Sequence, residues 1–202
     1  MAIIVNENQI PGTVLEAKRW WRSKVREAQK ELDDEYMKRA SEQISEKLFS
    51  LEEWKQAETV MLYVSAGKEV ITREMILDAA EQGKRICLPL CTDTKAHIME
   101  ARLWSEAVPL VAGAYGIPEP SPDTLTVPAT DIDLVVLPCM SCDSHRDRLG
   151  HGAGYYDRFL EQLRNDATTV ALCFEKIMAE SLPVEEHDQP VDVVLTEENK
   201  YI

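Results

Sequence analysis

The sequence predicts an α/β protein with a largely parallel central sheet, and two observations lead to this fold class. Five short apolar runs are rich in Val, Ile, Leu and Thr and have the length of strands, at residues 59–64, 85–90, 132–137, 169–174 and 191–195. Helical patterns lie between several of these runs. Strands that alternate with helices along a chain usually pair in parallel, with the helices packed on the sheet.

The segment before the first apolar run predicts one or two helices over residues 14–49, broken near residues 33–34. Apolar residues that recur at helical spacing are available for a buried face: Trp21, Val25, Leu32, Ile44 and Leu48. Another helix is expected over residues 72–82, and Gly83 follows it where a left-handed C-terminal residue is favoured. Residues 118–130 contain four prolines and predict a loop.

The length of 202 residues, with 45% hydrophobic residues, is enough to bury a sizeable core and favours one domain over residues 1–202. No stretch approaches the roughly 20 apolar residues that cross a bilayer, and the first residues turn polar too early for a secretory leader. We therefore expect a cytoplasmic protein. Its five cysteines are odd in number and too sparse for a disulfide framework, so reduced thiols are expected.

The net charge of −14 opposes polyanions at long range, which argues against nonspecific binding to nucleic acid or to an anionic membrane. An anionic small-molecule substrate would therefore need a local cluster of basic side chains. Lys18, Arg22 and Arg26 are spaced four residues apart, so a helix places them on one face, opposite Trp21 and Val25. The alternative is a solvated helix face paired with nearby glutamates.

A glycine-rich segment follows the third predicted strand and precedes a short helical pattern. It contains Gly150, Gly152 and Gly154 between Arg148 and Asp157. An α/β sheet usually binds its ligand at such a position, and glycines let the backbone approach phosphate oxygens. A helix starting near Tyr155 would direct free amides toward an anion. The spacing matches neither a Walker A motif nor a dinucleotide fingerprint, so a purely structural turn remains the alternative.

Two carboxylates and two cysteines offer possible metal ligands. Asp157 and Asp188 are candidate oxygen ligands for magnesium bound with a nucleotide, and equally candidates for a helix cap or a surface charge. Cys139 and Cys142, with histidines nearby, suggest a zinc site or a redox site. A structural zinc site normally has four ligands, so two small core or loop cysteines are favoured.

Several segments resemble, in order and spacing, the 5-formyltetrahydrofolate cyclo-ligase family, also called the methenyltetrahydrofolate synthetase family. Residues 137–143 and 148–158 resemble its signature. Residues 17–22 resemble its K-x-x-x-R element, residues 67–72 its G-x-E-V-D-T, residues 115–120 its Y-G-I-x-E-P, and residues 182–192 its last element. The similarity spans roughly residues 17–196. Five ordered elements are far more specific than one glycine loop.

The resemblance implies a single three-layer α/β domain with helices on both faces of the sheet. It also implies an enzyme that uses ATP and Mg²⁺ to convert 5-formyltetrahydrofolate to 5,10-methenyltetrahydrofolate, releasing ADP and phosphate. The formyl oxygen would first be phosphorylated, and a folate nitrogen would then close the ring. Positioning and charge neutralisation do most of the work in such a transfer, so no protein nucleophile is expected.

The resemblance also implies roles for individual residues. Lys18 and Arg22 would hold ATP phosphates, Asp157 and Asp188 would bind Mg²⁺, and Arg148 and Tyr155 would act in catalysis. The loop that wraps ATP would comprise Arg148, Leu149, Gly150, His151, Gly152, Ala153, Gly154, Tyr155 and Tyr156. Folate would lie along Val64, Glu69 and Tyr115 together with loop residues His151, Gly152, Ala153, Gly154 and Tyr155.

Three residues depart from the family pattern. Ala153 stands where many members have glycine or lysine, His151 where tyrosine or arginine is commoner, and Ile177 where a glutamine is expected. These departures leave open an ATP-dependent enzyme acting on another folate or formamide. A nonenzymatic zinc or redox module built on Cys139 and Cys142 is a rival from another class. The expected partners are small molecules, and a monomer is favoured.

Overall fold

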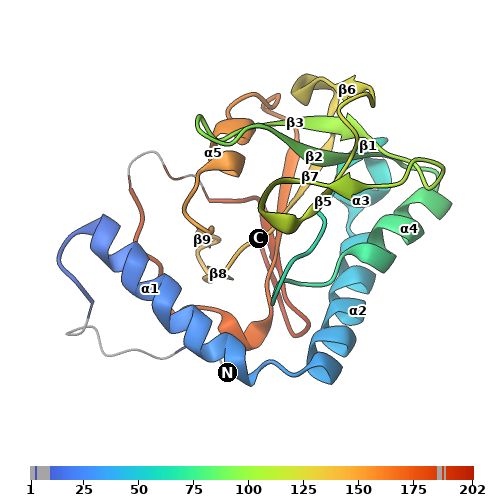
Figure 1. The fold of residues 1–202 in the computed structure, drawn as a ribbon. Coiled ribbons are helices and arrows are strands. Elements are labelled where there is room, and N and C mark those ends of the chain that lie inside the picture. Colours follow the sequence, from blue (N-terminus) through green and yellow to red (C-terminus); the bar gives the residue numbers. More distant parts are fainter. Residues whose placement is uncertain (1–2, 4–9, 186–187, 189) are drawn as a thin grey trace.

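The computed structural model describes residues 3, 10–185, 188 and 190–202, and these form an α/β fold around one large sheet (Figure 1). Its strands run in the order β12-β11-β10-β7-β1-β2-β3-β6. Their bounds are β1 Thr59–Met61, β2 Arg85–Asp93, β3 Ile98–Leu103, β6 Thr126–Val127, β7 Leu134–Leu137, β10 Thr168–Leu172, β11 Val193–Leu195 and β12 Lys200–Tyr201.

The middle of this sheet is parallel. Strands β11, β10, β7, β1 and β2 pair in parallel with their neighbours, whereas β12, β3 and β6 add antiparallel edges. All residues of β1, β7 and β11 are buried. Strands covered on both faces have continuous apolar runs, which is why these segments were recognisable in the sequence. All five predicted strands are present.

Helices cover the sheet on two sides. Their bounds are α1 Val14–Ala28, α2 Asp34–Ser50, α3 Glu52–Gln56, α4 Arg73–Glu81 and α5 Tyr155–Leu160. Short 3₁₀ turns are η2 Gln29–Glu31, η3 Ala114–Gly116, η4 Ala129–Asp131 and η5 Glu175–Ile177. Figure 1 shows α2 and α4 on one side of the sheet and α1 and α5 on the other. The arrangement matches the predicted fold class.

The N-terminal helices break where the sequence indicated. Asp33 is the N-cap of α2, and its side chain accepts a hydrogen bond of 2.7 Å from the backbone N–H of Tyr36. The carboxylate satisfies a donor that the helix leaves unpaired, and its charge suits the positive end of the helix. The five apolar residues predicted to face the core, Trp21, Val25, Leu32, Ile44 and Leu48, are all buried.

Removing this cap is expected to destabilise the protein. An Asp33→Ala variant should lose about 1 kcal/mol of the free energy of unfolding, measured by urea denaturation, because the Tyr36 amide loses its partner. Asp33→Asn keeps a capping oxygen and should lose much less. Equal losses in the two variants would assign the effect to the charge of Asp33 rather than to its hydrogen bond.

The proline-rich segment is only partly a loop. Strands β4 Val111–Ala112 and β5 Pro118–Glu119 form a hairpin, and β6 pairs with β3 at the edge of the large sheet. The loop prediction was therefore wrong for Pro118–Glu119 and Thr126–Val127, which lie in strands. Arg102 of β3 also holds the segment, since its Nη1 donates to the carbonyl oxygens of Pro122 (2.9 Å) and Thr124 (2.8 Å). This strand pairing is not visible in local propensities.

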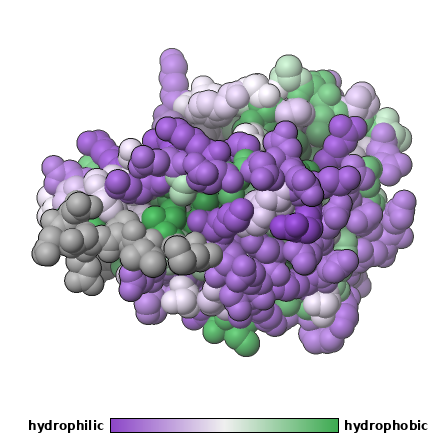
Figure 2. All heavy atoms as spheres, turned by 90° about the horizontal axis from the view of Figure 1, so that it is seen from below, coloured by the Kyte–Doolittle hydropathy of each residue, from purple (hydrophilic) through white to green (hydrophobic). Residues whose placement is uncertain are grey.

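Within the described ranges, no helix combines the length and apolar character needed to cross a membrane. The face shown in Figure 2 is largely hydrophilic, and its hydrophobic residues form separate small areas.

Candidate active site

The glycine loop connects two short elements that follow β7 along the chain. Strands β8 Ser141–Cys142 and β9 Arg148–Leu149 form a hairpin after β7, and the loop then enters α5 at Tyr155, as predicted. Gly152 and Gly154 have φ values of 104° and 75°. Residues with a Cβ atom are disfavoured at such φ values, so glycine is favoured at both positions. These two glycines therefore determine the path of the loop.

Arg158 fixes the loop from the side of α5. Its Nη1 donates to the carbonyl oxygens of Ala153 (3.1 Å) and Gly154 (2.9 Å). The Cβ of any other residue at Gly154 would lie 2.6 Å from this nitrogen. Arg158 was not singled out in the sequence, although it closes the motif that carries the glycines.

Arg22 joins helix α1 to the same loop. Its Nε donates to the carbonyl oxygen of Gly150 at 2.9 Å, and its guanidinium lies against Gly152. Burial lowers the pKa of Arg22, and the charges of Arg26 and Arg19 lower it further. The predicted basic stripe is thus divided: Lys18 and Arg22 face the site, whereas Arg26 is exposed.

A methyl group at Gly152 is expected to disturb this contact. In Gly152→Ala the new Cβ would strain the backbone at φ 104° and would lie 3.1 Å from Cζ of Arg22. Strain of this kind costs about 1–3 kcal/mol, so we expect the free energy of unfolding to fall by about that amount. The measurement is urea denaturation. Gly12→Ala is the matched control, because nothing lies within 4 Å of a Cβ there; equal free energies of unfolding for the two variants would contradict the prediction.

Lys18 lies between two carboxylates from the C-terminal part of the chain. Its Nζ is 2.8 Å from Oε2 of Glu185 and 2.5 Å from Oδ2 of Asp188. Burial acts to lower the pKa of Lys18, but the hydrogen bonds and charges of Asp188 and Glu185 outweigh it, and the pKa is raised. Lys18 is therefore held as a cation at the edge of the site. Glu185 lies in the segment that resembles the family's last element, but no role was predicted for it.

Arg148 and Asp157 form an ion pair at the two ends of the glycine loop. Arg148 also donates to the carbonyl oxygen of Pro138 at 3.3 Å, and its guanidinium lies 5.9 Å from the ring centroid of Tyr156. Burial raises the pKa of Tyr156, so this phenol stays neutral. Leu149 is buried and contributes packing to the core rather than a polar contact.

The two predicted magnesium ligands lie in one charged cluster but in separate ion pairs. Asp157 pairs with Arg148 and Asp188 with Lys18, while the charges of both carboxylates act on Arg22 between them. Glu185 N–H also donates to Asp188 at 2.7 Å. Residues 186, 187 and 189 lie outside the described part of the chain. The cluster combines hard oxygen ligands with cations suited to phosphate.

Glu69 belongs to the loop that follows β1 and faces the glycine loop. Its Oε2 accepts a 2.8 Å hydrogen bond from the backbone N–H of Ala66, and its Oε1 is 2.9 Å from Nε2 of His151. The Glu69 side chain is only 10% exposed, whereas that of His151 is 58% exposed. Val64, at the start of this loop, is half-buried and packs on the core. A rigidly held carboxylate thus meets the middle of the glycine loop.

Tyr115 and Tyr155 close another side of the loop. Their hydroxyl oxygens are 3.1 Å apart and their rings meet edge to face, with 6.2 Å between centroids. Tyr115 is 68% exposed and has a φ of 58°, which is unusual for a residue with a side chain. His97, not identified from the sequence, packs against Tyr155 at 5.2 Å. Burial and the bond to Tyr115 raise the pKa of Tyr155.

The remaining two departures from the family pattern are placed differently. Ala153 lies in the glycine loop, where its carbonyl oxygen accepts from Arg158. Ile177 is buried in η5, and its carbonyl oxygen accepts a 2.6 Å hydrogen bond from Ser141 Oγ. An apolar side chain at this position packs in the core.

Cys139 and Cys142 are joined by a third cysteine. The Sγ atoms of Cys139, Cys142 and Cys173 lie within 4.8 Å of one another, and all three residues are buried. Among the described residues this is the sole group of three or more His, Cys, Asp and Glu side chains close enough to share a metal ion. It is one ligand short of a structural zinc site.

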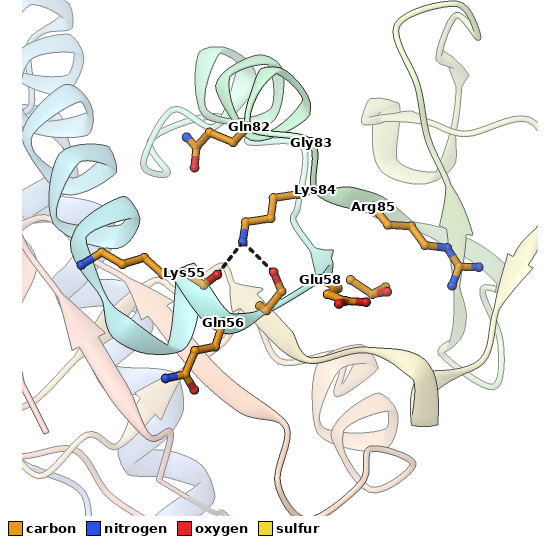
Figure 3. A pocket seen from close by; sticks show the side chains of 9 residues that line it. Lys55, Gln56, Glu58, Gln82, Gly83, Lys84 and Arg85 are labelled. Carbon is orange, nitrogen blue, oxygen red and sulfur yellow. Dashed lines mark hydrogen bonds between the residues drawn. The ribbon is translucent and has the colours of Figure 1, made fainter.

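A shallow pocket of about 570 Å³ lies far from the glycine loop (Figure 3). It is lined by the segments that begin β1 and β2, at the opposite ends of the parallel strands from the loop that follows β7. Its central cation, Lys84, already donates to the carbonyl oxygens of Trp54 (2.7 Å) and Ala57 (2.6 Å). These bonds satisfy backbone carbonyls at the end of α3, so Lys84 has a structural role.

Comparisons with known proteins agree with the sequence motifs. Residues 14–197 match the model of the 5-formyltetrahydrofolate cyclo-ligase family. A mouse 5-formyltetrahydrofolate cyclo-ligase is 30% identical, over 93% of this chain and 97% of its own length. The Escherichia coli K12 5-formyltetrahydrofolate cyclo-ligase is 28% identical, over 85% and 96%. The solved structure of Aquifex aeolicus 5,10-methenyltetrahydrofolate synthetase superposes with a TM-score of 0.79 at 32% identity, covering 91% of each chain.

Proposed function

The chain belongs to the 5-formyltetrahydrofolate cyclo-ligase family, and we propose that it uses ATP to convert 5-formyltetrahydrofolate to 5,10-methenyltetrahydrofolate, releasing ADP and phosphate. One observation supports this site for the reaction: the glycine loop contacts three other matching segments. Gly150 contacts Arg22 of α1, His151 contacts Glu69, and Tyr155 contacts Tyr115. Three segments far apart in sequence therefore meet at one loop.

The phosphates of ATP would bind on the basic side of this loop. Lys18, Arg22 and Arg148 bring three cations to it in a chain whose net charge is −14. Each already contacts a carboxylate or a backbone carbonyl, and the phosphate oxygens of ATP would replace or join these acceptors. The positive-φ glycines leave the loop backbone open to close approach by an anion.

Folate would bind on the other side of the loop, between Glu69, Val64 and Tyr115. The amino-pyrimidine edge of the pterin offers parallel donors, and a carboxylate accepts such a pair well. Glu69 is suited to this because its loop holds it in place through the Ala66 amide. Tyr115 would form an aromatic wall, and Tyr155 would line the folate close to the reacting formyl group.

The residues fit a magnesium ion that accompanies ATP. Asp157 and Asp188 supply hard oxygen ligands next to the proposed phosphate site, and two carboxylates plus phosphate oxygens are a typical ligand set. When bound, the ion would neutralise charge on the phosphates. If Lys18 and Arg148 contacted ATP in place of these carboxylates, both carboxylates would be free to bind the metal.

The chemistry requires positioning rather than a nucleophile from the protein. The formyl oxygen, a poor leaving group, attacks the γ-phosphorus and displaces ADP; the neighbouring folate nitrogen then attacks the activated carbon and phosphate leaves. Arg148 and Lys18 would stabilise charge on the transferring phosphoryl group. Tyr155, whose raised pKa keeps its hydroxyl protonated, would donate a hydrogen bond close to the formyl group.

We further propose that the chain is one domain that acts in the cytoplasm as a monomer on small-molecule substrates. The large sheet contributes a continuous core, which supports one domain. The face shown in Figure 2 has only small, separate hydrophobic areas, and stable self-association usually buries a large apolar patch, so this face is not expected to form an interface between copies. The net charge of −14 supports the absence of nucleic-acid and membrane partners.

The test is a purified-enzyme assay with 5-formyltetrahydrofolate, ATP and magnesium, following methenyltetrahydrofolate by its near-ultraviolet absorbance. Product is expected only when ATP is present, and Asp157→Ala should lose most of the rate. Asp34→Ala, which changes an exposed aspartate of α2, is the matched control. Folded protein that binds ATP without forming product would refute the substrate and favour another folate or formamide.

A further inference from the structure

Three buried thiols meet around the turn that leads from β7 into the β8–β9 hairpin and have no part in the proposed reaction. Cys139 follows β7, Cys142 lies in β8, and Cys173 follows β10. Their Sγ atoms lie within 4.8 Å of one another, and the residues are 4%, 0% and 1% exposed. A buried cysteine often serves as a small apolar residue, but three whose sulfur atoms lie this close can react with one another.

The sheet itself brings two of these thiols together. Strands β7 and β10 pair in parallel with Leu137 opposite Ala171, and Cys139 and Cys173 each lie two residues further along. The same register, continued, places them opposite each other. Cys139 Sγ also donates to the carbonyl oxygen of Leu172 at 3.1 Å. Cys142, three residues after Cys139, approaches through the turn into β8.

The three thiols are chemically unequal. Hydrogen bonds from Cys142 and Cys173 lower the pKa of Cys139 well below its usual value, and the charge of Arg148 contributes. Burial raises the pKa of both neighbours. By contrast, burial raises the pKa of Cys87, in β2, to about 12. Hydrogen bonding from its two neighbours thus favours the thiolate at Cys139, whereas burial favours the thiol at Cys142 and Cys173.

We propose that Cys139 is a site of oxidation by peroxide and that it forms an intramolecular disulfide with Cys142 or Cys173. The Cys139 thiolate attacks one peroxide oxygen, so that an S–O bond forms, the O–O bond breaks and hydroxide leaves as water. The neighbouring sulfur then attacks the resulting sulfenic acid, an S–S bond forms, and a second water leaves. Two thiols lose two electrons, and one peroxide gains them.

A disulfide suits this location better than a bound metal. Three thiolates around a divalent metal would leave a net negative charge in the core, whereas a disulfide is neutral. Within the described residues no fourth ligand completes the cluster. Hydrogen peroxide is close to water in size, and Cys139 retains the largest exposed fraction of the three.

Oxidation would act on the loop through β8. Cys142 is the register partner of Arg148 in the β8–β9 hairpin, and an S–S bond of about 2.05 Å would draw together sulfur atoms that now lie within 4.8 Å of one another. We therefore expect the oxidised protein to lose cyclo-ligase rate and to regain it with dithiothreitol. This consequence rests on the proposed role of Arg148, whereas formation of the disulfide does not.

The experiment treats the full-length folded protein with hydrogen peroxide, unfolds it in denaturant, alkylates the remaining thiols, and measures intact mass and cross-linked peptides. Wild-type protein is expected to lose two alkylatable thiols, with Cys139 in the cross-link. Cys139→Ala should lose none, and Cys87→Ala, the matched buried control in β2, should behave as wild type. Peptide mapping of the wild type needs no variant, so a variant that fails to fold does not remove the test.

Three results would overturn the proposal. One is a wild-type protein whose five thiols all remain alkylatable after peroxide. Another is a cross-link that excludes Cys139, or one that forms equally in Cys139→Ala. The third is stoichiometric zinc in the purified protein that protects these thiols, which would make the cluster a metal site. Full cyclo-ligase rate in fully cross-linked protein would refute the link to Arg148 only.

Discussion

Replacing Arg148 with alanine is expected to lower kcat by about a hundred- to a thousandfold, the usual effect of removing one group that stabilises transition-state charge. Arg148 holds Asp157, contacts the carbonyl oxygen of Pro138 and lies over Tyr156, so it positions a cation at the loop where phosphoryl transfer is proposed. The measurement is the initial rate of methenyltetrahydrofolate formation at saturating ATP and folate.

Two controls separate this effect from loss of structure. Arg39→Ala removes an exposed arginine of α2 and should leave kcat unchanged. Arg148→Lys keeps the charge but loses the planar fork that contacts Asp157, so it should recover only part of the rate. An Arg148→Ala enzyme with a normal thermal unfolding curve and a kcat within threefold of wild type would exclude Arg148 from the chemistry.

Glu69→Gln is expected to raise the KM for 5-formyltetrahydrofolate by roughly ten- to a hundredfold, with a smaller change in the KM for ATP. The amide oxygen can still accept from the Ala66 N–H, but the NH₂ group would face the donors of the pterin in place of a carboxylate oxygen. A hydrogen bond to a charged group contributes about 1.5–3 kcal/mol, which sets this range. The measurement is a folate titration at saturating ATP.

His151 provides a second arm of this test. Its imidazole contacts Glu69 in the absence of substrate, so His151→Ala should leave the carboxylate in place and change the KM for folate far less than Glu69→Gln. Glu42→Gln, on the exposed face of α2, is the matched control for the loss of one charge. A folate KM that Glu69→Gln leaves unchanged would remove Glu69 from the pterin site.

Much of the fold could be predicted because its signals are local. The five strands of the parallel centre are continuous apolar runs, and the break between α1 and α2 coincides with a capping aspartate. The start of α5 at Tyr155 follows from glycines that tolerate positive φ. By contrast, β3 and β6 have mixed sequences and are strands because their backbones pair with neighbouring strands.

Many residues of the candidate site could also be identified from the sequence, by their residue types and by the order of the motifs that contain them. Lys18, Arg22, Glu69, Tyr115 and Asp188 were all named there, and the glycine loop was assigned to the region that follows a buried strand. The spacing of a basic stripe on one helix could not decide between a solvated face and a binding face. That choice depends on what packs against the helix, which no local pattern contains.

Only the tertiary structure decided which of these groups meet. His151 reaches Glu69 across 82 residues because the parallel strands β1 and β7 bring their carboxyl ends to one edge of the sheet, and Arg22 of α1 reaches Gly150 across 128 residues. The same packing adds Cys173 to the cysteine pair and Glu185 to the partners of Lys18. The sequence determined the elements and the chemical groups through short-range propensity and capping, whereas long-range strand order and burial determined their pairing.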